Sequence, residues 1–244
     1  MIKKLLLVTL YPLLTLPVLA SQDFSECRHF FNNAQPPLID LPQKPQARAL
    51  CFSAFAILHS GQSRTPVYVA ERLNKQTLIA AKDTQRTNRF FADARVPRAE
   101  RAELDDFKGS GFDRGHMAPA ADMGSPEGMA QSFSLANMVP QAPINNRKAW
   151  ANIEKATRKY VMRASGDIFV ITGPAFDAGV RPQTIGKNQV WIPRHLFKLV
   201  YDPATKKSWA HWLENSDQAR ASKPISYTEL VRRTGIEFLP GYRD

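Results

Sequence analysis

Cysteine and long apolar runs are both scarce in this chain. Only two of the 244 residues are cysteine, Cys27 and Cys51, and His29 is the single histidine near them. They are therefore too few for a disulfide-rich scaffold and lack the further ligands of a cysteine-based metal site. Beyond residue 20 no run approaches the roughly 20 apolar residues of a spanning helix, so we expect no membrane span in the mature protein. Repeats and low-complexity tracts are also missing, which favours a globular chain.

Residues 1–20 are the one markedly apolar stretch. Lys3 and Lys4 precede a run of leucine and valine that ends in a small residue, Ala20, and two prolines interrupt it. A basic start, a short apolar middle and a small residue at the end are typical of a removable signal peptide. We expect cleavage after Ala20 and a periplasmic or secreted mature protein.

The two cysteines follow from that expectation. In an oxidising compartment Cys27 and Cys51 most simply form one disulfide, which would close a loop over the proline-rich residues 35–46. The chain-entropy model assigns such a loop roughly 3–4 kcal/mol of stabilisation. A reactive cysteine is the alternative, but neither cysteine has a plausible base beside it in the sequence.

Acidic residues are fewer than basic ones. Lysine and arginine number 33 against 22 aspartates and glutamates, and the formal net charge is +11, of which Lys3 and Lys4 supply two. With a pI near 9.8 the chain favours polyanionic partners, because cations that replace condensed counterions on phosphates gain affinity. Charge alone leaves nucleic acid, an anionic membrane, cell wall and simple solubility open.

Strand-like and helix-like segments alternate without a regular order. We expect a proline-rich arm over residues 21–49 and one domain over residues 50–244. Residues 74–110 are expected to be mostly an irregular loop. The pattern indicates an α+β fold. Strands are expected at residues 51–59, 65–72, 167–172, 189–193 and 196–201, and helices at 126–133, 146–163 and 227–233.

The tetrapeptide Asp113-Arg114-Gly115-His116 follows a glycine-containing turn. Histidine changes charge near neutral pH and can take a proton from water. In an extended backbone Arg114 lies on the same side as His116, where a guanidinium would stabilise charge on a phosphate. Asp113 would face the other way and tie down the loop. A lone histidine is more often an ordinary surface residue, so this motif is suggestive only.

A second polar cluster begins a predicted helix. Asn146 and Glu154 are eight residues apart, two turns along roughly one side of the helix. One amide oxygen and one carboxylate suit a hard cation that keeps most of its waters. A helix cap for Asn146 and a surface ion pair for Glu154 are the alternatives.

These blocks together resemble the DNA/RNA non-specific endonucleases of the ββα-metal, or His-metal finger, class. The resemblance spans about residues 50–240, and it implies a ββα-metal core on a central mixed or antiparallel sheet flanked by helices. Its blocks are Gly109 to Pro119, Asn137 to Gln141, Asn146 with Trp150 and Glu154, Thr172 to Pro174, residues 185–193 and the tail 235–240.

The resemblance also implies roles for single residues. His116 would activate the attacking water, and Arg114 would stabilise the transition state. Asn146 would be the direct ligand of a divalent metal, Mg²⁺ or else Mn²⁺ or another divalent cation, and Glu154 would hold metal-bound waters. Asn137 would lie near the substrate. Products would carry 5′-phosphates.

A further arginine of the family has two candidates here, Arg86 and Arg89, and we favour Arg86 slightly as the residue that contacts phosphate. The expected partners are double- and single-stranded DNA and RNA, and the oligomeric state stays open. An inactive relative that only binds nucleic acid and a cationic envelope-binding protein are the competing hypotheses. We expect structural roles for the other histidines and for two tryptophans: His29, His59, His195, His211, Trp191 and Trp212.

Overall fold

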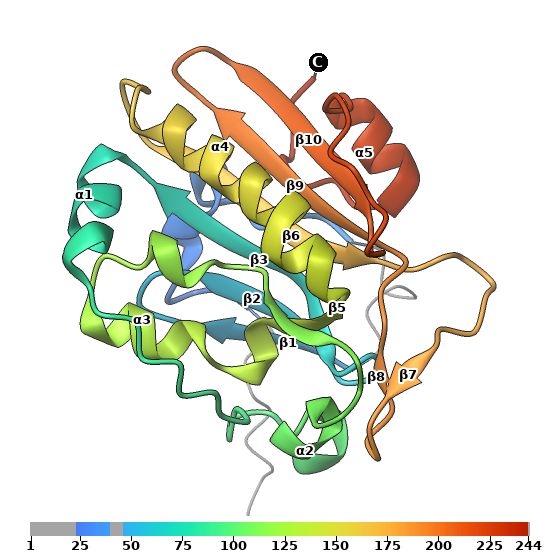
Figure 1. Cartoon of the computed structure of the whole chain (residues 1–244). Helices are drawn as coiled ribbons and strands as arrows, with labels where there is room; N and C mark the ends of the chain where they lie inside the picture. Colours follow the sequence, from blue (N-terminus) through green and yellow to red (C-terminus); the bar gives the residue numbers. More distant parts are fainter. Residues whose placement is uncertain (1–22, 40–45, 244) are drawn as a thin grey trace, which may run out of the picture.

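The computed structural model describes residues 23–39 and 46–243 and is built on one six-stranded sheet (Figure 1). The strand order is β1-β2-β3-β6-β9-β10, and every neighbouring pair is antiparallel. Two short pairs stand apart, β4 with β5 and β7 with β8. The predicted α+β class is confirmed. The strands are β1 Ala47–Cys51, β2 Ala56–Ser60, β3 Thr65–Leu73, β4 Asp113–His116, β5 Met138–Gln141, β6 Ile168–Ala175, β7 Thr184–Ile185, β8 Val190–Trp191, β9 His195–Asp202 and β10 Lys207–Glu214.

Five α-helices surround the sheet. A π-helical turn over Asn145–Trp150 leads directly into α4, so the predicted helix over residues 146–163 is present with a wider first turn. The 3-10 turn η5, Ala120–Asp122, follows β4. The α-helices are α1 Lys75–Asp83, α2 Leu104–Phe107, α3 Pro126–Ser132, α4 Ala151–Val161 and α5 Tyr227–Thr234.

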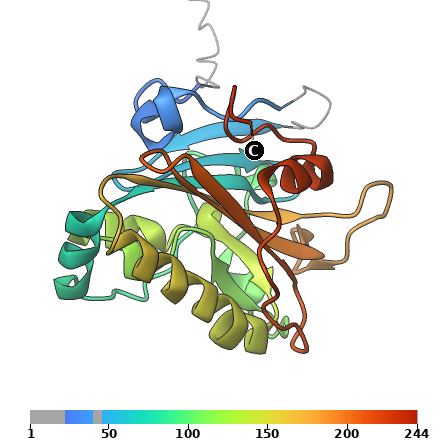
Figure 2. The same ribbon diagram turned by 90° about the horizontal axis from the view of Figure 1, so that it is seen from above.

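The sheet carries a core on each face. Along β3, Tyr68 and Ala70 belong to one buried cluster and Val69 to another, because successive strand residues point to opposite faces. The first cluster packs under α5 and the N-terminal segment, and the second packs under α4 and the β4–β5 pair. Figure 2 shows these two sets of elements on opposite sides of the sheet.

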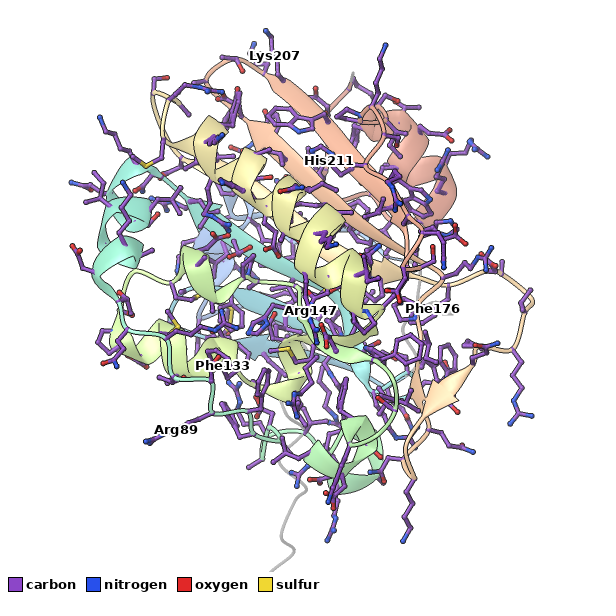
Figure 3. The ribbon with its side chains drawn as sticks, viewed as in Figure 1. Arg89, Phe133, Arg147, Phe176, Lys207 and His211 are labelled. Atoms are coloured by element: carbon purple, nitrogen blue, oxygen red, sulfur yellow. A yellow bond between two sulfur atoms is a disulfide. The ribbon has the colours of Figure 1, made fainter. Side chains whose placement is uncertain are left out.

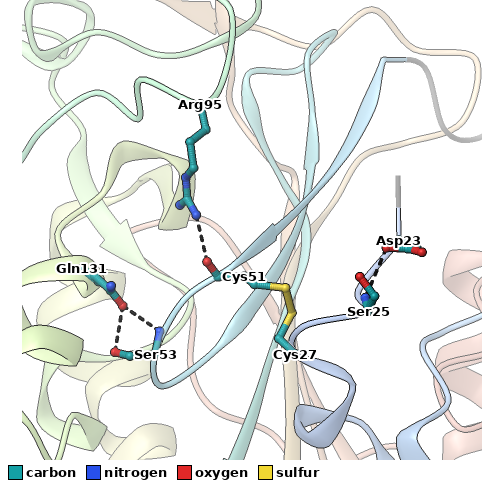
Figure 4. Close-up of a disulfide and its surroundings, with 7 residues drawn as sticks. All are labelled: Asp23, Ser25, Cys27, Cys51, Ser53, Arg95 and Gln131. Atoms are coloured by element: carbon teal, nitrogen blue, oxygen red, sulfur yellow. Dashed lines mark hydrogen bonds between the residues drawn. A yellow bond between two sulfur atoms is a disulfide. The ribbon is translucent and has the colours of Figure 1, made fainter. Parts of the chain in front are cut away.

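The N-terminal segment is part of the core and not a loose arm. Phe24, Phe30 and Phe31 are each at most 5% exposed and pack on β3. Cys27 and Cys51 form the predicted disulfide, with Cα atoms 5.6 Å apart (Figure 4). Since β1 begins at Ala47, the domain boundary expected at residue 50 falls inside a strand.

Two secondary-structure predictions were wrong. Residues 51–59 are not one strand, because the chain turns after Cys51, where the backbone N–H of Phe52 donates to the carbonyl of Phe55. The two phenyl rings stack 4.4 Å apart in that turn. Helix α1 was missed within residues 74–110, where Asn74 caps it by accepting from the backbone of Thr77.

Two further expectations concern the start of the chain. The leader over residues 1–20 and its cleavage after Ala20 lie outside the described residues. Within residues 23–39 and 46–243 no helix has both the length and the apolar character needed to cross a bilayer.

Candidate active site

The DRGH tetrapeptide forms strand β4, which pairs with β5 so that Asp113 lies opposite Gln141 and His116 opposite Met138. Gly109 and Gly111 both have positive φ in the turn that leads into it, a conformation most side chains avoid. Gly115 is required for a different reason. A Cβ atom there would overlap the Gln141 side chain, so only glycine lets β5 approach.

A cleft of about 390 Å³ opens beside β4. It brings together five of the residues singled out in the sequence: Arg86, Arg114, His116, Asn146 and Glu154. They come from the segment after α1, from β4, from the π-helical turn and from α4. Residues more than 30 positions apart in the sequence therefore line the same cleft, as the resemblance implies.

His116 is held by aromatic rings. Its imidazole lies edge-on to Phe133 at 5.0 Å between centroids and 5.8 Å from Phe90. Its Nε2 is buried and has no hydrogen-bond partner. Burial, together with a smaller effect of the positive charge of Arg86, lowers the pKa of His116 to about 3. The ring is therefore neutral at physiological pH, as a proton acceptor must be.

Two guanidinium groups approach this histidine. Arg114 lies over the Phe90 ring at 4.2 Å and Arg86 over the Phe133 ring at 5.0 Å, while Arg86 also donates to Asn88. Arg89 does not line the cleft, and in Figure 3 it extends away from the ribbon. Of the two candidate arginines, Arg86 therefore lines the cleft and Arg89 does not.

Asn146 stands at the start of the helix with its amide oriented by Asp113. Its Nδ2 donates to Asp113 Oδ2 at 3.0 Å, which leaves the amide oxygen free of that contact. Arg147 makes a two-pronged ion pair with the same carboxylate, at 2.6 and 2.9 Å. The expectation that Asp113 only ties down its own loop was incomplete. It joins β4 to the helix.

Glu154 lines the cleft two turns further along. Burial raises the pKa of its carboxyl to about 7, and the positive charge of Lys198 opposes that rise. A nearby cation would favour the ionised form. Behind it lies a charged layer that the sequence did not indicate: Arg158 donates to Asp122 and Lys198 to Thr172, while the Glu71 carboxylate is fully buried without a hydrogen bond.

Asn137 does not reach the cleft, contrary to its expected place near the substrate. The side chain is fully buried, and its amide both accepts from Ala118 N–H and donates to the carbonyls of Ala118 and Ser132. It braces the backbone just after His116. The other four histidines also lie outside the cleft lining, including His211 on β10 (Figure 3).

The donor set fits a hydrated divalent cation. Among the described residues no cluster of three or more His, Cys, Asp or Glu side chains could form a metal cage. The Asp113 carboxylate also lines the cleft but accepts from Asn146 and Arg147, so we take the Asn146 amide oxygen and the Glu154 carboxylate as the candidate oxygen donors. Mg²⁺ binds readily to so few protein oxygens because it retains several waters and takes others from phosphate.

A two-stranded β unit followed by a helix, with histidine on the strand and asparagine at the helix start, defines the ββα-metal class of fold. The chain belongs to the DNA/RNA non-specific endonuclease family, whose sequence profile matches residues 39–244. The predicted family is thereby confirmed.

Individual relatives agree with that family. The human protein named "Endonuclease G, mitochondrial" is 35% identical over 156 residues, 60% of this chain and 52% of the human one. "Nuclease EXOG, mitochondrial" of Danio rerio is 38% identical over 72% of this chain and 56% of its own. A solved structure titled "Crystal structure of the EndoG/EndoGI complex: Mechanism of EndoG inhibition" superposes with a TM-score of 0.69 at 25% identity, over 79% of this chain and 84% of that one. This chain spans about half the length of the curated relatives it matches.

The expected periplasmic or secreted location is contradicted by these relatives. The human, zebrafish and Schizosaccharomyces pombe proteins all carry "mitochondrial" in their names. A short leader that is basic and apolar and has no acidic residue is compatible with more than one targeting route. The composition of residues 1–20 therefore did not decide the compartment.

Proposed function

We propose that this protein is an endonuclease that uses a divalent metal to hydrolyse phosphodiester bonds of DNA and RNA without sequence preference. The observation that carries the proposal is the single cleft in which a neutral histidine faces two guanidinium groups and two oxygen donors. These are the parts that hydrolysis of a phosphodiester needs: a base, positive charge for the phosphate, and support for the leaving oxygen.

His116 is the base in this proposal. Because its Nε2 is buried without a partner, Nδ1 is the ring nitrogen available to a water in the cleft. The lowered pKa keeps the ring neutral, so in the tautomer that carries its proton on Nε2 the Nδ1 lone pair can accept a proton, and the flanking phenyl rings hold the imidazole in one orientation. Water that has lost its proton to His116 then attacks the phosphorus.

Arg114 and Arg86 face the phosphate. A guanidinium presents several N–H donors in one plane and does not lose its charge, so it matches the oxygens of a phosphorane-like transition state. Packing over Phe90 and Phe133 limits the motion of both side chains. Donors fixed in advance stabilise developing charge without further reorganisation.

Asn146 and Glu154 would hold the metal, Asn146 through its amide oxygen and Glu154 through bound water. When bound, a divalent cation acts as a Lewis acid on the phosphate and favours departure of the 3′-oxygen, which yields 5′-phosphate products. Asp113 keeps the Asn146 amide in the required orientation. Arginines that address phosphate do not read bases, in keeping with cleavage of both DNA and RNA.

The direct test is an activity assay on purified protein with plasmid, single-stranded DNA and RNA. We expect all three to be degraded with Mg²⁺ and degradation to stop when a chelator is added. Binding of all three without cleavage, under a series of divalent metals, would instead identify a nucleic-acid-binding relative that has lost activity.

A further inference from the structure

A second groove adjoins the candidate active site, between α1 and α4. It has a volume of about 520 Å³, and Ala121 lines both this groove and the catalytic cleft. The two spaces therefore meet at η5, which carries Ala121. The floor of the groove is apolar: Leu78, Ala81, Ala121 and Met162.

The rim of the same groove is strongly basic. Its charged lining consists of Lys82, Lys155, Arg158, Lys159 and Arg163. Arg158 is committed to Asp122, whereas the other four form no ion pair with a carboxylate in the part of the chain that the structure describes. All four are exposed. A run of exposed cations without counter-charges favours an anionic ligand.

The cations on and just after α4 recur at intervals of four residues: Lys155, Lys159 and Arg163. Lys155 and Lys159 are one such interval apart on the helix, about 6 Å along its axis, and Arg163 follows in the turn after Val161. That step is of the same order as the separation of successive phosphates on a nucleic-acid strand. Lys155 immediately follows Glu154, about 100° around the helix, so the row runs beside the catalytic face.

We propose that this groove, bounded by Lys82 on α1, by Lys155 and Lys159 on α4 and by Arg163 just beyond the end of α4, binds the phosphates of the substrate strand beyond the cleaved bond. The proposal rests on the proposed function, because the strand enters the groove from the catalytic cleft across Ala121. No aromatic side chain lines the groove. Contact is therefore with the sugar-phosphate backbone, in contrast to the base-stacking sites of many single-strand binders.

This surface predicts a specific dependence on salt. Each phosphate neutralised by a cation contributes about 0.7 to the slope of log affinity against log salt on a single strand, and about 0.9 on duplex DNA. We therefore expect the triple variant Lys155→Gln, Lys159→Gln, Arg163→Gln to make the negative slope of log(kcat/KM) against log salt shallower by about 2 on single-stranded DNA. The variant should hydrolyse bis(p-nitrophenyl) phosphate at the wild-type rate, because this compound is too short to reach from the catalytic cleft into the groove.

The matched control removes the same charge elsewhere. Arg28, Arg232 and Arg243 are exposed, and they lie in the N-terminal segment, on α5 and at the C-terminal end. The variant Arg28→Gln, Arg232→Gln, Arg243→Gln keeps the wild-type slope if the groove determines the salt dependence. Equal slopes for the two triple variants would overturn the proposal, and an equal change in both would show an effect of net charge alone.

Two other outcomes are distinguishable. Failure of wild type to hydrolyse either substrate would defeat the proposed function itself. If the variant of Lys155, Lys159 and Arg163 keeps the wild-type slope on DNA but no longer binds vesicles containing an anionic lipid, the groove binds membranes and the proposal is overturned.

Discussion

The most informative single residue is His116, whose protonation is governed by burial and not by a partner. A histidine beside aromatic rings and near Arg86 has no group that would stabilise its charged form. The imidazole therefore stays neutral, and able to accept a proton, over the whole physiological pH range.

Replacing His116 by alanine should lower kcat by about 10²- to 10⁴-fold, because general-base catalysis supplies factors of this size. Binding of DNA should change little, since no cation is removed. Rates measured under saturating Mg²⁺ check this, with Arg89→Ala as the control from the same surface outside the cleft. A near wild-type rate for the histidine variant would refute the role of the base.

The same variant should also alter stability in acid. The folded pKa of about 3 lies below the ordinary value of 6.5, so His116 favours folding above pH 6.5 and this contribution is lost as the pH falls toward 3. The Tm of His116→Ala should consequently fall less steeply than the Tm of the wild type as the pH is lowered from 6.5 toward 3.

At the scale of elements, the site depends on how β4 is fastened to the π-helical turn before α4. Asp113 on the strand receives hydrogen bonds from Asn146 and Arg147 on the turn. Such π-turns are frequent at functional sites, and this one changes the angular relation of Asn146 to Glu154. Both side chains nevertheless line the same cleft.

Removing this fastening should weaken the metal site. We expect Asp113→Ala to raise the metal concentration needed for half-maximal activity by about 10- to 100-fold, the usual effect of losing a residue that orients a ligand. Arg147→Ala is the control, because it removes the ion pair and keeps the hydrogen bond to Asn146. If the two variants show the same metal titration, Asp113 does not act by orienting Asn146.

At the scale of the whole molecule, the N-terminal segment closes one face of the sheet and α4 with its neighbours closes the other (Figure 2). The disulfide fastens this segment to the end of β1, and Leu38 adds a backbone bridge to Glu237 near the other end of the chain. Residues 23–39 are thereby joined to β1 and to the segment after α5 on the face opposite the cleft.

Reducing the disulfide should lower stability with little effect on activity at low temperature. A closed loop with a sequence separation of 24 is worth about 3 kcal/mol in the chain-entropy model, which corresponds to a fall in Tm of roughly 10 °C for a domain of this size. Thermal scans with and without reductant measure it, and a Cys27→Ser, Cys51→Ser variant should not respond to reductant. An unchanged Tm for the reduced wild type would contradict the expected contribution.

Local sequence predicted those parts of the site that depend on neighbouring residues. Arg114 and His116 alternate along one strand, so their common side follows from backbone geometry. The spacing of Asn146 and Glu154 placed both on one side of a helix. The resemblance of the ordered motifs to a known family did most to bring these two pairs together.

Other features were not accessible in this way. The buried contacts of Asn137 with Ala118 and the hydrogen bond from Asn146 to Asp113 were not predicted, because these partners lie 19 and 33 residues away in the chain. The sequence favoured Arg86 over Arg89 only slightly, and the folded chain places Arg86 in the cleft lining, over the Phe133 ring, and leaves Arg89 outside that lining. The compartment could not be derived from leader composition.

The sequence by itself therefore determined the family, the α+β class, the disulfide pair and the candidate base, because each is encoded in residue types and their local order. The tertiary structure decided which arginine enters the cleft, what orients the Asn146 amide, and where a basic groove adjoins the site. Those features depend on distances between segments far apart in the chain, which burial and packing set and which no local pattern specifies.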